Sequence, residues 1–232
     1  MKNQILTLMI ILGAALGVAA QKTFLLTKAS KTYDLKVTIE KCEDDTCEGP
    51  ATVYLLRKGD EKAFQTIRME NLFLELGTDQ KPTANLIELY GENNSGVIFE
   101  DYNFDGIEDL ALRNGNFGNY GGPSYDVLLF SKKKRQFVLN DPLTVLASEN
   151  LGMFDVDPIR KTIETFAKSG CCWHERTRYK IVNDRPVKVY VLTEDVPPGD
   201  GTIVILTTRT LVNGKWKKKV KRVPTKDYYK DQ

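Results

Sequence analysis

The sequence contains a single histidine, His174, and only four cysteines, and neither sign of charge is in large excess. A lone histidine leaves no plausible catalytic triad, and neither a Gly-x-Ser-x-Gly elbow nor a His-Glu-x-x-His motif is present. With 33 basic and 31 acidic residues, the chain has no overall electrostatic reason to seek nucleic acid. These absences predict a protein that is neither an enzyme nor a nucleic-acid binder. A glycosidase whose carboxylate pair is brought together by folding stays an alternative.

Beyond residue 20 no segment is apolar enough to cross a bilayer. The uncharged run Ile5–Ala20 is short for a membrane span and carries the small residues Val18 and Ala20 at the positions that a signal peptidase reads. We therefore predict a signal peptide over residues 1–20, cleavage before Gln21, and a periplasmic or secreted protein. An uncleaved anchor is the alternative. No cysteine follows the run, so nothing indicates a lipoprotein.

The four cysteines form two local pairs in the sequence, Cys42 with Cys47 and Cys171 with Cys172. Export places them in an oxidising compartment, where disulfides are expected. Cys42–Cys47 has the spacing of a hairpin loop closed by its own bond, which would leave the adjacent Cys171 and Cys172 to bond in a strained eight-membered ring. Cross-pairing between the two sites stays open, because four cysteines allow three connectivities.

Short apolar runs with turn residues between them dominate the chain and predict strands. The expected strands are 33–39, 51–56, 64–69, 72–76, 86–90, 96–100, 109–113, 125–130, 136–139, 162–166, 176–182, 187–193, 202–211 and 216–223. This pattern predicts an all-β fold, an antiparallel meander in a sandwich, barrel or propeller-like arrangement. Little helix is expected beyond a turn or two in Pro142–Asn150. Residues 21–232 are expected to form a single β-rich domain, with a possible N-terminal hairpin layer over 21–77 that ends at the stretch Gly77–Ala84.

The segment 101–109 reads Asp-Tyr-Asn-Phe-Asp-Gly-Ile-Glu-Asp and has the spacing of a calcium loop. Calcium takes six to eight oxygen ligands, and alternate residues of a tight loop can point oxygens inward while Gly106 permits the sharp turn. The predicted ligands are the side chains of Asp101, Asn103, Asp105 and Asp109 and the backbone carbonyl of Ile107. Position 12 is Leu112 rather than glutamate, and strands are expected on both flanks, so the loop is similar to those of FG-GAP-type β-propeller blades.

The predicted role of the ion is structural, because a divalent cation offsets the repulsion of three carboxylates on one turn. An Asp/Asn-rich turn held by bonds from side chain to backbone is the alternative.

A glycine- and asparagine-rich stretch, residues 114–125, follows directly and contains two tyrosines. Tyrosine is a typical anchor of protein interfaces, so Tyr120 and Tyr125 are candidate contact residues. For Tyr125 the alternative is that it opens a strand and faces the core. A phosphate-binding loop is excluded, since neither a Lys-Ser/Thr pair nor a following helix is present.

Two further segments have plain interpretations. Cys171, Cys172 and His174 could contribute to a soft-metal site, but zinc needs a fourth ligand and export favours oxidised sulfur, so a disulfide-bonded turn is expected. The cationic run Lys215–Val223 is expected to be an exposed edge strand whose lysines prevent further pairing.

These motifs together resemble a family of bacterial periplasmic proteins related to lysozyme inhibitors, which includes immunity proteins against peptidoglycan hydrolases. The matching features are the signal peptide, the loop 101–109 followed by a strand, the segment ending Ser124-Tyr125-x-Val127-x-Leu129, and Ser169-Gly170-Cys171-Cys172-x-His174 before a strand that contains Tyr179. The resemblance covers roughly residues 96–195.

The resemblance implies inhibition of a muramidase by an exposed loop that enters the substrate cleft. Carried over, that loop is Gly121, Gly122, Ser124 and Tyr125, with Tyr120 beside it; Pro123 departs from the family pattern. The expected function is thus a calcium-binding inhibitor or immunity protein whose partner is a muramidase-type hydrolase. The alternative is a calcium-stabilised cell-surface or adhesion module.

Overall fold

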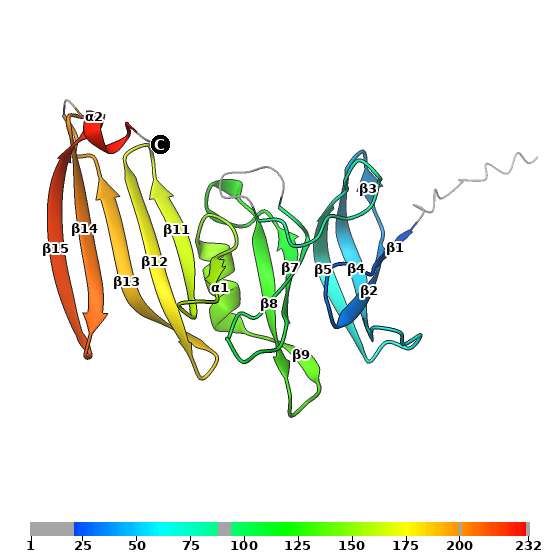
Figure 1. The fold of residues 1–232 in the computed structure, drawn as a ribbon. Helices are drawn as coiled ribbons and strands as arrows, with labels where there is room; N and C mark the ends of the chain where they lie inside the picture. The colour runs from blue at the N-terminus through cyan, green and yellow to red at the C-terminus, as the bar shows by residue number, and fades with distance from the viewer. Residues whose placement is uncertain (1–20, 88–93, 200, 231–232) are drawn as a thin grey trace, which may run out of the picture.

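The computed structural model describes residues 21–87, 94–199 and 201–230, and the predicted signal peptide lies outside these ranges. Three antiparallel sheets follow one another along the chain (Figure 1). Neighbouring strands in each sheet are mostly joined by hairpins, as in a meander. The predicted all-β class is confirmed.

The N-terminal sheet has five strands in the order β1-β2-β4-β3, with β5 paired to β4. Its strands are β1 (Lys22–Leu26), β2 (Tyr33–Ile39), β3 (Cys42–Glu43), β4 (Thr46–Arg57) and β5 (Gln65–Glu75). The sequence predicted two strands where β5 is one. The register between β4 and β5 shifts between Gly49 and Ala51, so a β-bulge accommodates Glu70 and Asn71 without a turn.

The central sheet is buried on both faces. Its strands are β6 (Val97–Glu100), β7 (Asp109–Gly115), β8 (Ser124–Ser131) and β9 (Gln136–Leu139). Because successive side chains of a strand point to opposite faces, Leu110 and Leu112 of β7 join the core shared with the N-terminal sheet, while Ala111 joins a second core. The central sheet therefore packs between the other two layers.

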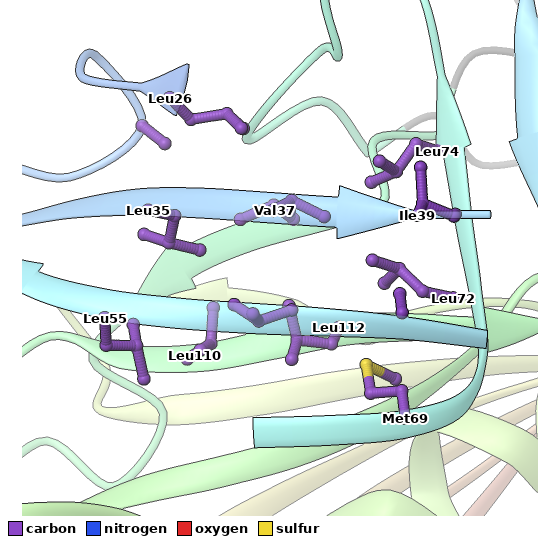
Figure 2. Packing of buried hydrophobic residues seen from close by; sticks show 14 of the residues in the cluster. Leu26, Leu35, Val37, Ile39, Leu55, Met69, Leu72, Leu74, Leu110 and Leu112 are labelled. Carbon is purple, nitrogen blue, oxygen red and sulfur yellow. The ribbon is translucent and has the colours of Figure 1, made fainter. Parts of the chain in front are cut away.

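The first core joins the N-terminal and central sheets into one packed unit. Leu35, Val37 and Leu55 of the N-terminal sheet lie in the same cluster as Leu110 and Leu112, all fully buried (Figure 2). The predicted N-terminal layer, residues 21–77, thus shares its core with the central sheet.

The C-terminal sheet has six strands in sequence order, with one helix between it and the central sheet (Figure 1). Its strands are β10 (Asp155–Asp157), β11 (Thr162–Ser169), β12 (Trp173–Val182), β13 (Arg185–Asp195), β14 (Ile203–Val212) and β15 (Lys215–Pro224). Helix α1 (Asp141–Glu149) contacts β8 and β13, close to the predicted helical segment. Its N-cap Asn140 accepts a hydrogen bond from the Leu143 amide at 3.0 Å.

The ends of the chain also bear on the sequence predictions. β15 pairs only with β14 among the described strands and is largely exposed, as expected of the cationic edge strand. A short helix, α2 (Thr225–Tyr228), follows it.

The strand predicted over 86–90 is not found at Leu86 and Ile87, and its remainder lies outside the described residues. No helix within the described ranges is long and apolar enough to span a membrane.

Candidate functional site

The loop 101–109 connects β6 and β7, whose register places Glu100 opposite Asp109. Its Asp and Asn side chains accept hydrogen bonds from backbone amides of the loop itself. Asp101 Oδ1 and Asn103 Oδ1 both accept from the Asp105 amide, at 3.0 and 3.1 Å, and Asp101 Oδ2 accepts from the Gly106 amide at 2.8 Å. Gly106 has a φ of +86°, the conformation for which glycine was expected.

Asp109 lies at the base of the loop and is almost completely buried. Its carboxylate accepts from the Tyr102 amide at 3.0 Å and from the Phe130 amide at 2.8 Å. Burial raises the pKa of Asp109 to about 7, and the negative charges of Asp101 and Asp105 contribute to the increase while the two amide bonds oppose it. The charged form of this side chain is therefore disfavoured chiefly by burial, with a smaller contribution from like charge.

The predicted calcium ligands lie on one turn, but their side chains are turned mainly toward backbone amides. Ile107, for example, donates its amide to Asp105 Oδ1 at 3.0 Å. Among the described residues, no three His, Cys, Asp or Glu side chains gather as a metal-ligand group. The bonding is that of the Asp/Asn-rich turn considered as the alternative. An ionised carboxylate has two oxygens with about four lone-pair sites, so the oxygen set suits a hard cation such as calcium, and the bonds leave acceptor capacity for one.

The loop contacts all three layers of the molecule. Glu108 accepts from Ser30 Oγ at 2.7 Å and from the Lys31 amide at 3.2 Å, which ties the loop to the segment between β1 and β2. Asn103 Nδ2 donates to Asp184 Oδ1 at 3.0 Å in the turn between β12 and β13. Ser30 and Asp184 were missed by the sequence analysis, since they lie 78 and 81 residues from their partners.

Two of the predicted partner-binding residues are buried, and their assignment as contact residues is wrong for this structure. Ser124 and Tyr125 open strand β8 and have 0% exposed surface. The Tyr125 ring packs in the second core and its hydroxyl donates to the Ser95 carbonyl at 3.1 Å, while Ser124 Oγ donates to Asn114 Oδ1 at 2.6 Å. The strand begins at Ser124, so its inward-facing positions belong to the sheet and not to the loop.

Tyr120, by contrast, is 65% exposed. It lies in a short 3-10 turn, Asn119–Gly121, at a φ of +59°. Its hydroxyl accepts a hydrogen bond from the Gly170 amide at 2.8 Å, and Lys168 Nζ lies 4.9 Å from its ring centroid. Gly121 beside it is exposed and Gly122 is partly exposed. The loop therefore presents one tyrosine that contacts between strands hold in place.

The turn that contacts Tyr120 contains the second cysteine pair. The structure forms the local disulfides Cys42–Cys47 and Cys171–Cys172, and no cysteine among the described residues is free. Both sulfurs at 171 and 172 are thus bonded to each other, as the sequence analysis favoured over a soft-metal site. His174 instead stacks on Phe166, with ring centroids 5.7 Å apart, and faces Glu194. Disulfides are typical of compartments outside the cytoplasm.

We use the term Tyr120 surface for the exposed residues of this loop and of the turn that it contacts: Phe117, Tyr120, Gly121, Gly170 and Cys171. Phe117 is 74% exposed on the same loop as Tyr120, and Cys171 is exposed on the turn between β11 and β12. The sequence motifs that carry the resemblance, the glycine–tyrosine stretch and Ser169-Gly170-Cys171-Cys172, therefore meet in space through Tyr120 and Gly170. Because 50 residues separate Tyr120 and Gly170, this contact could not be predicted from the sequence.

Comparison with known proteins supplies one informative match. No protein-family model matches the chain, and no curated protein does. A solved structure described as a Xanthomonas type IV secretion system related protein is similar, with 25% sequence identity and a TM-score of 0.66. The match covers 89% of this chain and 96% of the other. The likeness therefore spans all three sheets.

Proposed function

We propose that the protein is an exported inhibitor or immunity protein that binds a lysozyme-like peptidoglycan hydrolase through the Tyr120 surface. The observation that carries the proposal is the placement of Tyr120: a large amphipathic ring, 65% exposed, anchored by the Gly170 amide. A side chain already held in one orientation loses less entropy on binding than a free one. Exposed aromatics on loops positioned by a rigid scaffold are typical contact residues.

The chemistry of the target suits this surface. A muramidase cleft contains a carboxylic acid and a carboxylate. The Tyr120 hydroxyl accepts from Gly170, so its own proton is available for a hydrogen bond to such a group. Lys168 beside the ring adds a positive charge. Gly121 and Gly122 keep the neighbouring chain narrow, which favours entry into a cleft.

Two further features support the proposal. The Xanthomonas structure belongs to a protein related to a secretion system, and the resemblance stated above is to a family that includes immunity proteins against delivered hydrolases. We further propose that calcium binds at the loop 101–109 and stabilises the fold. The loop joins all three layers, and a cation there would offset the repulsion among Asp101, Asp105 and Asp109.

The test is binding to, and inhibition of, a panel of muramidases from different lysozyme classes. We expect tight binding to at least one, and Tyr120→Ala to weaken it by about 2 kcal/mol, roughly 30-fold. Trp216→Ala is the matched control, because Trp216 is a 48% exposed aromatic on the β14–β15 hairpin. Binding without loss of hydrolase activity would indicate the binding module instead, and equal effects of the two variants would contradict the role of Tyr120.

A further inference from the structure

A groove of about 990 Å³ lies beside the loop 101–109, where the N-terminal and central sheets meet. Five basic residues line it, and we call it the basic groove: Lys28, Lys31, Arg57, Lys132 and Arg135. Their sources lie far apart in the sequence, in the segment between β1 and β2, at the end of β4 and in the turn between β8 and β9. Folding therefore gathers positive charge that the overall composition does not reveal.

Most of these cations have no acidic partner. Lys132 lies 3.4 Å from Asp105, but Lys28, Lys31, Arg57 and Arg135 form no salt bridge with any described residue. Three acidic residues also line the groove. Glu108 accepts from Ser30 and the Lys31 amide, Asp101 accepts from amides of its own loop, and Glu100 accepts from the Asp101 amide. Five basic residues against three acidic ones leave the groove with a net positive charge.

The floor of the groove is aromatic and carries one unused polar group. Tyr33, Phe99 and Phe130 line it, with the Tyr33 and Phe99 rings stacked at 6.1 Å. Tyr33 is only 2% exposed, yet no hydrogen bond among the described residues involves its hydroxyl. Burial raises the pKa of Tyr33, while the positive charge of Arg57 lowers it and the negative charge of Glu108 raises it. Among the described side-chain atoms that solvent does not reach, only Arg113 Nε lacks a partner, so the Tyr33 hydroxyl is reached by solvent and can donate to a ligand that supplies an acceptor.

A peptide strand is not the natural occupant, because the nearby sheet edge is already used. On β6, the Val97 carbonyl accepts from the Asn85 amide at 3.0 Å, and the Phe99 amide donates to Asn85 Oδ1 at 2.7 Å. An extended peptide that adds to a sheet needs free edge groups. A ligand in this groove must instead be held by side chains.

We propose that the basic groove binds an anionic saccharide, a sugar that bears a carboxylate or a phosphate. Arginine and lysine recognise both anions. The partly exposed ring of Phe130 can support the apolar face of a sugar ring, and the Tyr33 hydroxyl can donate to a ring or anion oxygen. The volume lies within the usual range for small-ligand sites. None of these residues belongs to the Tyr120 surface, so the proposal does not depend on muramidase binding.

The experiment is a titration of the mature chain, by calorimetry and by protein-observed NMR, with three sugars. N-acetylmuramic acid supplies a carboxylate, N-acetylglucosamine 6-phosphate a phosphate, and N-acetylglucosamine is the neutral control. We expect at least one anionic sugar to bind about tenfold or more tightly than the neutral one, the difference that one charged contact supplies. Which anion binds better identifies the source, cell-wall glycan or phosphorylated sugar.

Variants localise the binding. Arg57→Gln should weaken it about tenfold, Arg57→Lys less, and Tyr33→Phe several-fold, since that change removes only the hydroxyl. Lys217→Gln on β15 is the matched control and should leave binding unchanged. Thermal melting of each variant checks that it folds. The proposal is overturned if the neutral sugar binds equally well, if Lys217→Gln is as damaging as Arg57→Gln, or if an acidic peptide binds the groove while neither anionic sugar does.

Discussion

The two neighbouring loops of the central sheet, residues 101–109 and 114–125, are held in place by different kinds of contact. In the first, the side chains of Asp101, Asn103 and Asp105 bond the amides of their own loop, two to five residues away. In the second, Tyr120 bonds Gly170 and Tyr125 bonds the carbonyl of Ser95, 50 and 30 residues away. The conformation of the first loop is set mainly by bonds within the loop, and that of the second by contacts with the sheets around it.

This difference shows when the spacing of residues in the sequence predicts the conformation of a loop. A pattern of Asp and Asn at alternate positions specifies its own turn, so the shape of the first loop follows from the sequence. A tyrosine on a glycine-rich stretch carries no such information. Tyr120 and Tyr125 are only five residues apart, but one is 65% exposed and the other is fully buried. Their roles are set by whether a strand has begun.

The largest effect expected from this contrast is on Tyr125. Tyr125→Ala should lower the free energy of unfolding by about 3–5 kcal/mol, the range for removing a large aromatic side chain from a packed core. Urea denaturation monitored by circular dichroism measures it. Tyr125→Phe is the control and should cost only about 1 kcal/mol, since it removes one hydrogen bond and keeps the ring. An alanine variant as stable as the wild type would place Tyr125 on the surface.

Tyr120 should show the smallest effect on stability. Because it is mostly exposed, Tyr120→Ala should change the free energy of unfolding by no more than about 0.5 kcal/mol. The same urea experiment measures it. A loss of several kcal/mol would show that the ring has a structural role, and a binding defect of that variant could then no longer be assigned to the Tyr120 surface.

Much of the fold was predictable, because strand periodicity and turn residues are local signals. β2, β7, β8 and α1 were predicted within a residue or two at most ends. β5 was divided in two because the sequence shows the polar pair Glu70 and Asn71 but not the bulge that absorbs it.

The candidate site was predictable only in its local part. Gly106 adopts the expected positive φ, and the local cysteine pairs form. The contacts of Glu108 with Ser30, of Asn103 with Asp184, and of Tyr120 with Gly170 each join residues at least 50 positions apart. The basic groove likewise combines three distant segments, so no motif could indicate it.

We propose that the locally defined loop 101–109 binds calcium and thereby holds the layers of the molecule together. Calcium titration of the chelator-treated protein by calorimetry tests it most directly, with Asp105→Ala as the variant and the exposed Asp60→Ala as the control. We predict binding of one ion per chain by wild type and Asp60→Ala, loss of binding by Asp105→Ala, and about 2.7 kcal/mol of added stability at calcium concentrations 100 times the dissociation constant. No heat of binding in the wild type, or undiminished binding by Asp105→Ala, would contradict the account.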